Sequence, residues 1–364
     1  MSTKKRILFF TKDLNRTGAE IILFNIVESL DRSKFDIGVV VMQPGGELVS
    51  HLPKDVHLFY LESTFNLFDK IRFHLGEDVM LNRLKRIENE FKSDIWYINT
   101  VDNAYLLKFK EHFLVKTCLH VHEYLYNFEQ IAAQEIKLLI DQADQVIGCS
   151  ILVEKLFEQL IGTKYITFQS AIDTHYIDRC LTETMPKSDN KKRIVSSGTL
   201  CYRKGLDIFL EASTFFTDSN VEFIWLGKWP NNGYAALLKR KINAGEFPNV
   251  QILDQLNHQE YVQTMRSADL FLSCSREESM GLVMMEAIYC GVPVLATDSG
   301  GSSLIVNDQN GKVCFDSRPA TLANEVQHLI ENHSQFDPVS MRKSIEKYDG
   351  EVEIRKLENI LSKI

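Results

Sequence analysis

The sequence predicts an α/β protein made of two doubly wound domains, each built on a parallel sheet. Short, apolar, β-rich runs alternate with longer segments of helical period, which is the pattern of βαβ units. The chain has 364 residues, more than one hydrophobic core usually organises. With 45% hydrophobic and 25% charged residues, its composition is typical of soluble globular proteins.

The strand-like runs form two sets, and each set predicts one sheet. In the first half the expected strands are 7–10, 37–42, 57–61, 95–99, 117–121, 146–149 and 165–168. In the second half they are 194–197, 221–226, 250–253, 270–273, 292–296 and 312–315. The polar segment 178–193 contains a proline and little apolar periodicity, so it is expected to be the linker. The predicted domains are therefore 1–177 and 194–340, followed by a helical segment at 341–364.

Charge and cysteine usage exclude several classes of function. The net charge of −8 disfavours a protein that grips nucleic acid through a broad cationic face. The seven cysteines form no C-x-x-C pair, which suits a reducing compartment better than a disulfide framework or a zinc site. The apolar run at 7–10 is too short for a signal peptide, and no stretch approaches the ~20 apolar residues of a membrane span. We expect a cytoplasmic protein.

Residues 269–306 carry most of the functional signal. A strand runs into a polar loop, a helix follows from Leu282, and a second strand leads into the loop at Gly300 and Gly301. Backbone N–H groups at a helix start are unpaired and attract anions. A diphosphate is therefore expected to dock at this helix start, on Ser279, Met280, Gly281 and Leu282.

Two glutamates flank that helix start. Glu286, inside the helix, is placed to accept hydrogen bonds from ribose hydroxyls, and Glu278, in the loop, from hydroxyls of a sugar. The alternative interpretation is structural: Glu278 caps the helix and Glu286 is a solvated helix residue.

The segment closely resembles the donor-binding signature of the family-four retaining glycosyltransferases, also called glycosyl transferases group 1. The matching positions are Ser275, Glu278, Gly281-Leu282, Glu286-Ala287, Cys290-Gly291, Pro293-Val294 and Gly300-Gly301. The resemblance implies the GT-B fold, in which two Rossmann-like domains face a central cleft, with the C-terminal helix packing back toward the first domain. It also implies a nucleotide-sugar donor and retention of anomeric configuration.

A second match follows the first strand of the second half. In the family this loop ends in Lys-Gly and its Lys contacts the donor diphosphate, which assigns that role to Lys204. Negative charge builds on the departing nucleotide, so a cation there stabilises the transition state. The family Arg earlier in the loop is Thr199 here, and Arg203 is the candidate replacement. Leu304 stands where the family has a Glu.

The first half offers two further candidates. Gly18 lies in a loop that resembles the family loop facing the donor phosphates, although Thr17 and Glu20 also fit a helix-capping box. His122, at the end of a strand, matches the family His beside the donor sugar. The alternative is a purely structural role, which most lone histidines have. His120 and His122 lack further metal ligands at suitable spacing, and the chain has no Asp-x-Asp triplet. We expect no metal and no other cofactor.

Together these features predict a retaining, metal-independent glycosyltransferase with His122, Lys204 and Glu278 as catalytic residues. The expected partners are a nucleotide-diphosphate sugar and a saccharide or lipid-linked acceptor of surface polysaccharide or glycoconjugate synthesis, with no nucleic acid. The alternatives are a non-catalytic or degenerate nucleotide-sugar-binding protein, a nucleotide-sugar epimerase, a sugar phosphorylase, and, least favoured, a two-domain hydrolase. Aromatic and basic residues at 65–84 suggest peripheral contact with the inner face of a membrane, with helical packing as the favoured alternative.

Overall fold

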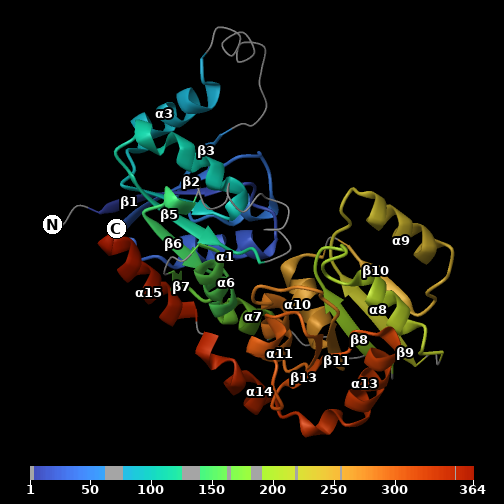
Figure 1. Ribbon diagram of the computed structural model, residues 1–364. Coiled ribbons are helices and arrows are strands. Elements are labelled where there is room, and N and C mark those ends of the chain that lie inside the picture. The colour runs from blue at the N-terminus through green and yellow to red at the C-terminus, as the bar shows by residue number, and fades with distance from the viewer. Residues whose placement is uncertain are drawn as a thin grey trace. The chain divides into compact units, whose positions relative to one another are not determined.

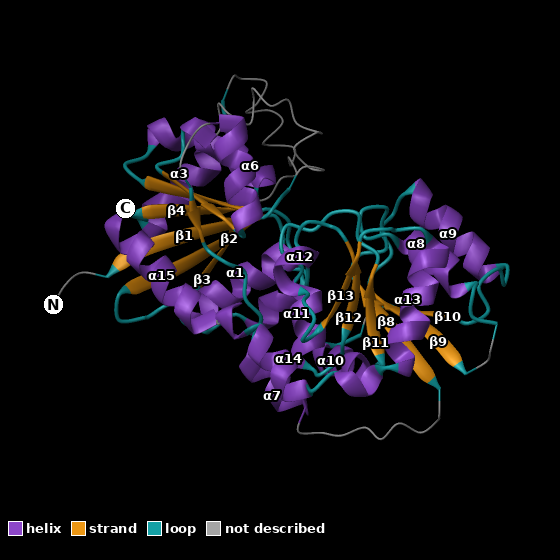
Figure 2. Cartoon of the chain, turned by 60° about the horizontal axis from the view of Figure 1, so that its bottom comes forward, coloured by secondary structure: helices purple, strands orange, loops and turns teal. Residues whose placement is uncertain are grey.

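The computed structural model describes residues 4–61, 77–124, 140–161, 165–181, 191–217, 220–254, 256–348 and 350–364. The chain divides into two compact units, Met1–Ala171 with Gly350–Ile364, and Ile172–Asp349. Each unit contains one parallel sheet flanked by helices (Figures 1 and 2). The predicted fold class is therefore confirmed. Most of the 65–84 segment considered for membrane contact, residues 65–76, lies outside the described residues.

The first unit is built on a sheet with strand order β3-β2-β1-β4-β5-β6-β7. Its strands are β1 (Lys5–Thr11), β2 (Phe35–Val41), β3 (His57–Tyr60), β4 (Ile95–Asn99), β5 (Lys116–Val121), β6 (Gln145–Gly148) and β7 (Ile166–Thr167). Its helices are α1 (Gly18–Ser29), α3 (Val79–Phe91), α6 (Ile151–Ile161) and α15 (Gly350–Lys363), with the 3-10 segments η1 (Glu47–His51) and η2 (Val101–His112).

The central strands of this sheet are buried on both faces, which explains their continuous apolar sequence. Every residue of β4 is buried, and β1 is buried from Ile7 onward. All pairings are parallel, and Phe10 of β1 lies opposite Val40 of β2 and Ile98 of β4. The carboxyl ends of β1, β4 and β5 therefore share one edge of the sheet.

The second unit has the strand order β10-β9-β8-β11-β12-β13. Its strands are β8 (Lys192–Ser197), β9 (Val221–Leu226), β10 (Val250–Leu253), β11 (Leu270–Ser273), β12 (Val294–Thr297) and β13 (Gly311–Cys314). Its helices are α7 (Thr174–Leu181), α8 (Leu206–Ser213), α9 (Gly233–Asn243), α10 (His258–Arg266), α11 (Leu282–Tyr289), α12 (Ser302–Ile305), α13 (Pro319–Glu331) and α14 (Pro338–Ser344), with η3 (His333–Gln335) and η4 (Glu346–Tyr348).

The last helix, α15, completes the first unit. Leu357 and Leu361 are fully buried, and Lys5 of β1 donates hydrogen bonds of 3.1 Å to the carbonyls of Leu361 and Ser362. Glu358 accepts a hydrogen bond of 2.8 Å from the backbone N–H of Asp31. These contacts confirm that the C-terminal helix packs against the first domain. It begins at Gly350, however, and the preceding helix α14 stays with the second unit.

The structure places the boundary between the units differently from the prediction. Residues 178–181, expected to open a linker, form the end of α7, and 182–190 lie outside the described residues. Ile177 and Cys180, three positions apart on one helical face, are buried in the hydrophobic core of the second unit. The intervening polar residues masked this short apolar face in the sequence.

Candidate active site

Three loops at the carboxyl edge of the second sheet are joined by backbone hydrogen bonds. They follow β8, β11 and β12. The N–H of Arg276 donates to the carbonyl of Arg203 at 2.8 Å, which joins the first two loops. The N–H of Glu278 donates to the Ser299 carbonyl at 2.8 Å, and Gly301 donates to the Glu278 carbonyl at 2.9 Å. These bonds bring the polar side chains of the three loops close together.

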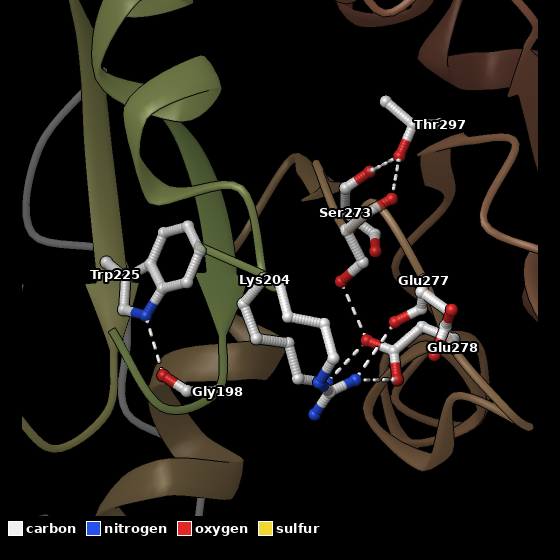
Figure 3. A network of polar contacts seen from close by, with 9 residues as sticks. Gly198, Lys204, Trp225, Ser273, Glu277, Glu278 and Thr297 are labelled. Carbon is white, nitrogen blue, oxygen red and sulfur yellow. Dashed lines mark hydrogen bonds and ion pairs between the residues drawn. The ribbon is translucent and has the colours of Figure 1, made fainter. Parts of the chain in front are cut away.

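Glu278 is the centre of a polar cluster in these loops (Figure 3). Its Oε1 accepts hydrogen bonds from Nζ of Lys204 at 2.5 Å and from the Ser275 hydroxyl at 2.7 Å. Its Oε2 lies 3.4 Å from Nη1 of Arg203. Burial alone would raise the pKa of Glu278, but the two cations outweigh it, so the pKa lies below its usual value and the carboxylate is charged at neutral pH.

Glycines position the Lys204 side chain. Gly198 has φ +138°, and a Cβ there would lie 3.1 Å from Cε of Lys204. Its carbonyl accepts a hydrogen bond of 2.8 Å from the indole N–H of Trp225, which fixes the loop (Figure 3). Gly205 has φ +72° and packs directly on the Cys274 backbone, since a Cβ would come within 1.9 Å of that carbonyl oxygen. Lys204 is therefore held between close backbone contacts.

The start of α11 has the geometry that the sequence predicts for an anion site. The helix begins at Leu282, and its N-cap, Gly281, has φ +98° and no side-chain capping bond. The first N–H groups of a helix have no intrahelical acceptor. The loop that leads to them contains Ser279 and the buried Met280, directly after Glu278. Helix start and polar cluster are therefore adjacent.

Glu286 is half-buried rather than fully solvated, and a partly buried tyrosine binds it. The hydroxyl of Tyr261, from α10, donates a hydrogen bond of 2.7 Å to Oε2 of Glu286. Burial raises the pKa of Tyr261 well above its usual value, so this hydroxyl keeps its proton and remains a donor. The carboxylate of Glu286 is thus oriented by a neighbouring helix.

In the first unit, His122 follows β5 and is bound by the last residue of β4. Asn99 donates from Nδ2 to the carbonyl of Ala19 at 3.3 Å, so its Oδ1 accepts from Nε2 of His122, 2.8 Å away. This leaves Nδ1 of His122 as a buried acceptor without a hydrogen-bond partner among the described residues. Burial lowers the pKa of His122 to about 3, so the ring is neutral at physiological pH.

Gly18 is the first residue of α1, next to Ala19 and therefore close to Asn99. A Cβ at Gly18 would meet nothing within 4 Å, so the backbone is open at this point. The expected capping box is not formed: the Thr17 hydroxyl donates to Glu20 Oε2 instead of accepting from the backbone. Burial raises the pKa of Glu20 to about 7, so at neutral pH about half of these carboxyls are protonated, and a protonated carboxyl is a weaker acceptor for backbone N–H groups.

Comparison with known proteins decides the family of the second domain. Residues 182–349 match the family model described as "Glycosyl transferases group 1". This part of the chain belongs to the group 1 glycosyltransferases. A curated D-inositol 3-phosphate glycosyltransferase of Jonesia denitrificans is 29% identical over 184 residues, which cover 48% of this chain and 43% of that protein. The chain thus spans less than half the length of this curated relative.

Two further comparisons extend over more of the chain. A GDP-mannose-dependent mannosyltransferase of Corynebacterium glutamicum that acts on a monoacylated phosphatidylinositol monomannoside is 24% identical, covering 58% of this chain and 60% of that protein. The structure of Anabaena HepE in complex with UDP-glucose has a TM-score of 0.80 at 19% identity, covering 99% of this chain and 100% of that one. Sucrose-phosphate synthase of Thermosynechococcus elongatus also has a TM-score of 0.80, at 16% identity over 99% of both chains. These structural matches show the GT-B fold.

This group 1 glycosyltransferase domain departs from the family pattern at two positions. Thr199, in place of the family Arg, is exposed, while Arg203 reaches the carboxylate of Glu278 and the carbonyl of Glu277. A guanidinium is therefore present in the cluster although it comes from a different residue. Leu304, in place of the family Glu, lies in α12, and its carbonyl accepts a hydrogen bond of 2.6 Å from Tyr348.

Sequence reasoning did not identify a second ion pair in these loops. Arg276 binds both carboxylate oxygens of Asp207, at 2.9 and 2.7 Å, and its guanidinium lies 3.8 Å from the ring centroid of Tyr202. Tyr234 donates to the same Asp207 at 2.9 Å. Arg276 and Asp207 are 69 positions apart, so no local pattern could pair them.

Two features are absent from the described part of the chain. No group of three or more His, Cys, Asp or Glu side chains there has a metal-binding arrangement. None of the helices in that part combines the length and the apolar character needed to cross a bilayer. The expected independence from metal stays a prediction.

Proposed function

We propose that this protein is a retaining glycosyltransferase that moves a sugar from a nucleotide-diphosphate donor to a saccharide or lipid-linked acceptor. The observation that carries the proposal is the Lys204–Glu278 contact beside the start of α11, which has no side-chain capping bond. Two cations and a row of helix-terminal N–H groups are suited to a diphosphate, and a nearby carboxylate to sugar hydroxyls. The family match of the same residues supports this assignment.

In this proposal the residues of the second domain stabilise the leaving nucleotide. As the glycosidic bond breaks, charge moves onto the diphosphate, and Lys204, Arg203 and the N–H groups at Leu282 bind it more strongly than in the ground state. Glu286, oriented by Tyr261, accepts hydrogen bonds from the ribose. No metal ion is required, because these donors supply the positive charge.

In the first domain, the candidate residues are His122 and Gly18. The neutral imidazole has a free lone pair on Nδ1, which suits it to accept a hydrogen bond from a sugar hydroxyl. Retention of configuration and a role in surface polysaccharide or glycoconjugate synthesis rest on the family resemblance. A structural neighbour in complex with UDP-glucose and a relative named as GDP-mannose-dependent support a nucleotide-sugar donor. We propose a cytoplasmic location.

Thermal-shift measurements with UDP-, GDP-, ADP- and TDP-sugars test donor binding, with and without a chelator. A ligand at about 100 times its Kd stabilises the folded protein by about 2.7 kcal/mol. The donor that raises the melting temperature is then supplied with a labelled sugar and candidate acceptors. Transfer of the label to an acceptor, with the anomeric configuration of the donor retained, supports the proposal. Absence of any shift with all four donors contradicts it.

A second candidate function is a degenerate donor-binding protein, which Thr199 and Leu304 favour because both replace charged residues of the family. It predicts a thermal shift with one nucleotide sugar but no release of nucleotide over prolonged incubation with acceptors. An epimerase differs from both, since it would change the sugar of the donor without using an acceptor.

A further inference from the structure

We propose that the Glu278 carboxylate makes this site select sugar-linked diphosphates over free nucleoside diphosphates, by holding a fixed negative charge against the cations that bind the diphosphate. The inference rests on the function proposed above and adds a determinant of specificity to it. Three features support it: the number of cations that are available, the fixed position of the carboxylate, and the charge of the two kinds of ligand.

The available positive charge at this site is small. Lys204 and Arg203 both contact Glu278, so the pair of cations shares one carboxylate. Arg276, the third cation of these loops, is bound through two nitrogens to Asp207 and also stacks on Tyr202. It is therefore already neutralised. The cluster retains a surplus of about one positive charge for a ligand.

The carboxylate of Glu278 cannot easily move away from the cations. The residue is only 6% exposed, and Ser275 donates to its Oε1 at 2.7 Å. On either side of the side chain, the backbone N–H and carbonyl are bound to Ser299 and Gly301. Because Lys204 and Arg203 keep its pKa below the usual value, it stays ionised at neutral pH. A ligand therefore meets a fixed charge.

The two kinds of ligand differ by nearly one negative charge, which lies on the diphosphate. The diphosphate of a nucleotide sugar carries two negative charges because both phosphates are esterified. A free nucleoside diphosphate carries nearly one more at neutral pH, since a terminal phosphate loses its second proton with a pKa of about 6. Repulsion from a nearby carboxylate grows with that charge. Glu278 therefore weakens binding of the free diphosphate more than binding of the donor, which favours release of the product.

Calorimetric titration with UDP, GDP and ADP and with their glucose conjugates tests this inference. Glu278→Gln keeps the size of the side chain and removes the charge. Of the three free diphosphates, we expect the one that binds the wild type to bind Glu278→Gln about tenfold tighter. The affinity for its sugar conjugate should rise less, or fall. The matched control Glu211→Gln makes the same change of net charge at an exposed residue of α8 in the same domain and should leave both affinities unchanged. Equal or weaker binding of the free diphosphate to folded Glu278→Gln overturns the inference.

A second measurement needs no variant and applies even if Glu278→Gln does not fold. The wild-type protein is titrated with the same nucleoside diphosphate carrying a methyl ester on its terminal phosphate, which removes the extra charge without adding a sugar. We expect the ester to bind several-fold tighter than the free diphosphate; weaker binding of the ester overturns the inference. Failure of all of these ligands to bind contradicts the proposed function itself, whereas binding without this preference contradicts only the role of Glu278.

Discussion

The hydroxyl of Tyr261 lies 2.7 Å from Oε2 of Glu286 and donates a hydrogen bond to it. The contact links α10 to α11, two helices that are separate in the sequence, and it fixes one oxygen of the carboxylate. A carboxylate has several acceptor positions, and the bond to Tyr261 uses one of them. Tyr261 therefore orients Glu286.

Replacing Tyr261 by Phe should weaken donor binding while the domain stays folded. The variant removes only the hydroxyl, so Glu286 loses its orienting partner and its carboxylate can rotate. A hydrogen bond to a charged group contributes about 1.5–3 kcal/mol, which corresponds to an increase in Kd of about 10-fold or more. Titration with the nucleotide sugar checks this. Tyr289→Phe is the matched control, because its hydroxyl binds Asp178 at 2.8 Å, away from Glu286. Equal effects of the two variants would contradict the role of Tyr261.

Lys204→Ala should lower turnover by about a hundredfold or more if its ammonium stabilises charge on the departing nucleotide. The variant leaves Arg203 as the remaining cation beside Glu278. Steady-state measurement of kcat with the labelled donor checks the effect, and Lys228→Ala, at an exposed lysine of the same domain, serves as the control. Normal turnover in Lys204→Ala would exclude this role.

Two glycines with similar backbone angles separate steric contact from backbone strain. Gly205 and Gly245 have φ +72° and +80°, but a Cβ at Gly205 would lie 1.9 Å from the Cys274 carbonyl oxygen, whereas at Gly245 it would meet nothing within 4 Å. Gly245→Ala should cost about 1–2 kcal/mol through its left-handed conformation alone. Gly205→Ala should cost at least about 2 kcal/mol more, because backbone must move. Thermal unfolding of both variants checks this, and equal losses would contradict the packing described here.

The stability of the first domain should depend on the ionisation of Glu123. Its carboxylate accepts hydrogen bonds from the N–H groups of Val101 and His122, and burial raises its pKa from 4.5 to about 7. A raised pKa means that the folded state holds the proton more tightly, so this stabilisation is full below pH 4.5 and is lost as the pH rises through 7.

Glu123→Gln cannot ionise, so relative to the wild type its free energy of unfolding should rise between pH 5 and pH 8. The expected gain is at most about 3 kcal/mol, from a shift of roughly two and a half pKa units. Chemical unfolding at the two pH values measures it, with Glu90→Gln at an exposed residue of α3 as the control. A variant whose relative stability is the same at both pH values would show that the folded state does not raise the pKa of Glu123.

The strands were predictable from the sequence to within about two residues, because buried parallel strands are short apolar runs with sharp polar ends. The helix at Leu282 was also correct, since Gly281 and Gly291 mark its ends. Short helices with mixed sequence were not. The helix α7 buries only Ile177 and Cys180, which is too little apolar periodicity to stand out in a polar segment.

At the candidate site, the sequence identified residues that lie in local motifs and missed those that act from a distance. Lys204 and Glu278 were identified separately, and the structure places their side chains in contact. Tyr261 and Asp207 were missed because their partners, Glu286 and Arg276, are distant in the sequence and come close only in the folded domain. Thr17 and Glu20 fit a capping pattern, but burial favours a bond between the two side chains.

The first domain is assembled from two stretches of sequence, with the whole second domain between them. On the ribosome, β1 and α1 therefore emerge early. Lys5 and Asp31 can form their hydrogen bonds to α15 only after that helix has been synthesised. A nascent chain would carry an incomplete first domain while the second is already able to fold. Premature termination anywhere before Gly350 would thus damage the half of the molecule made first.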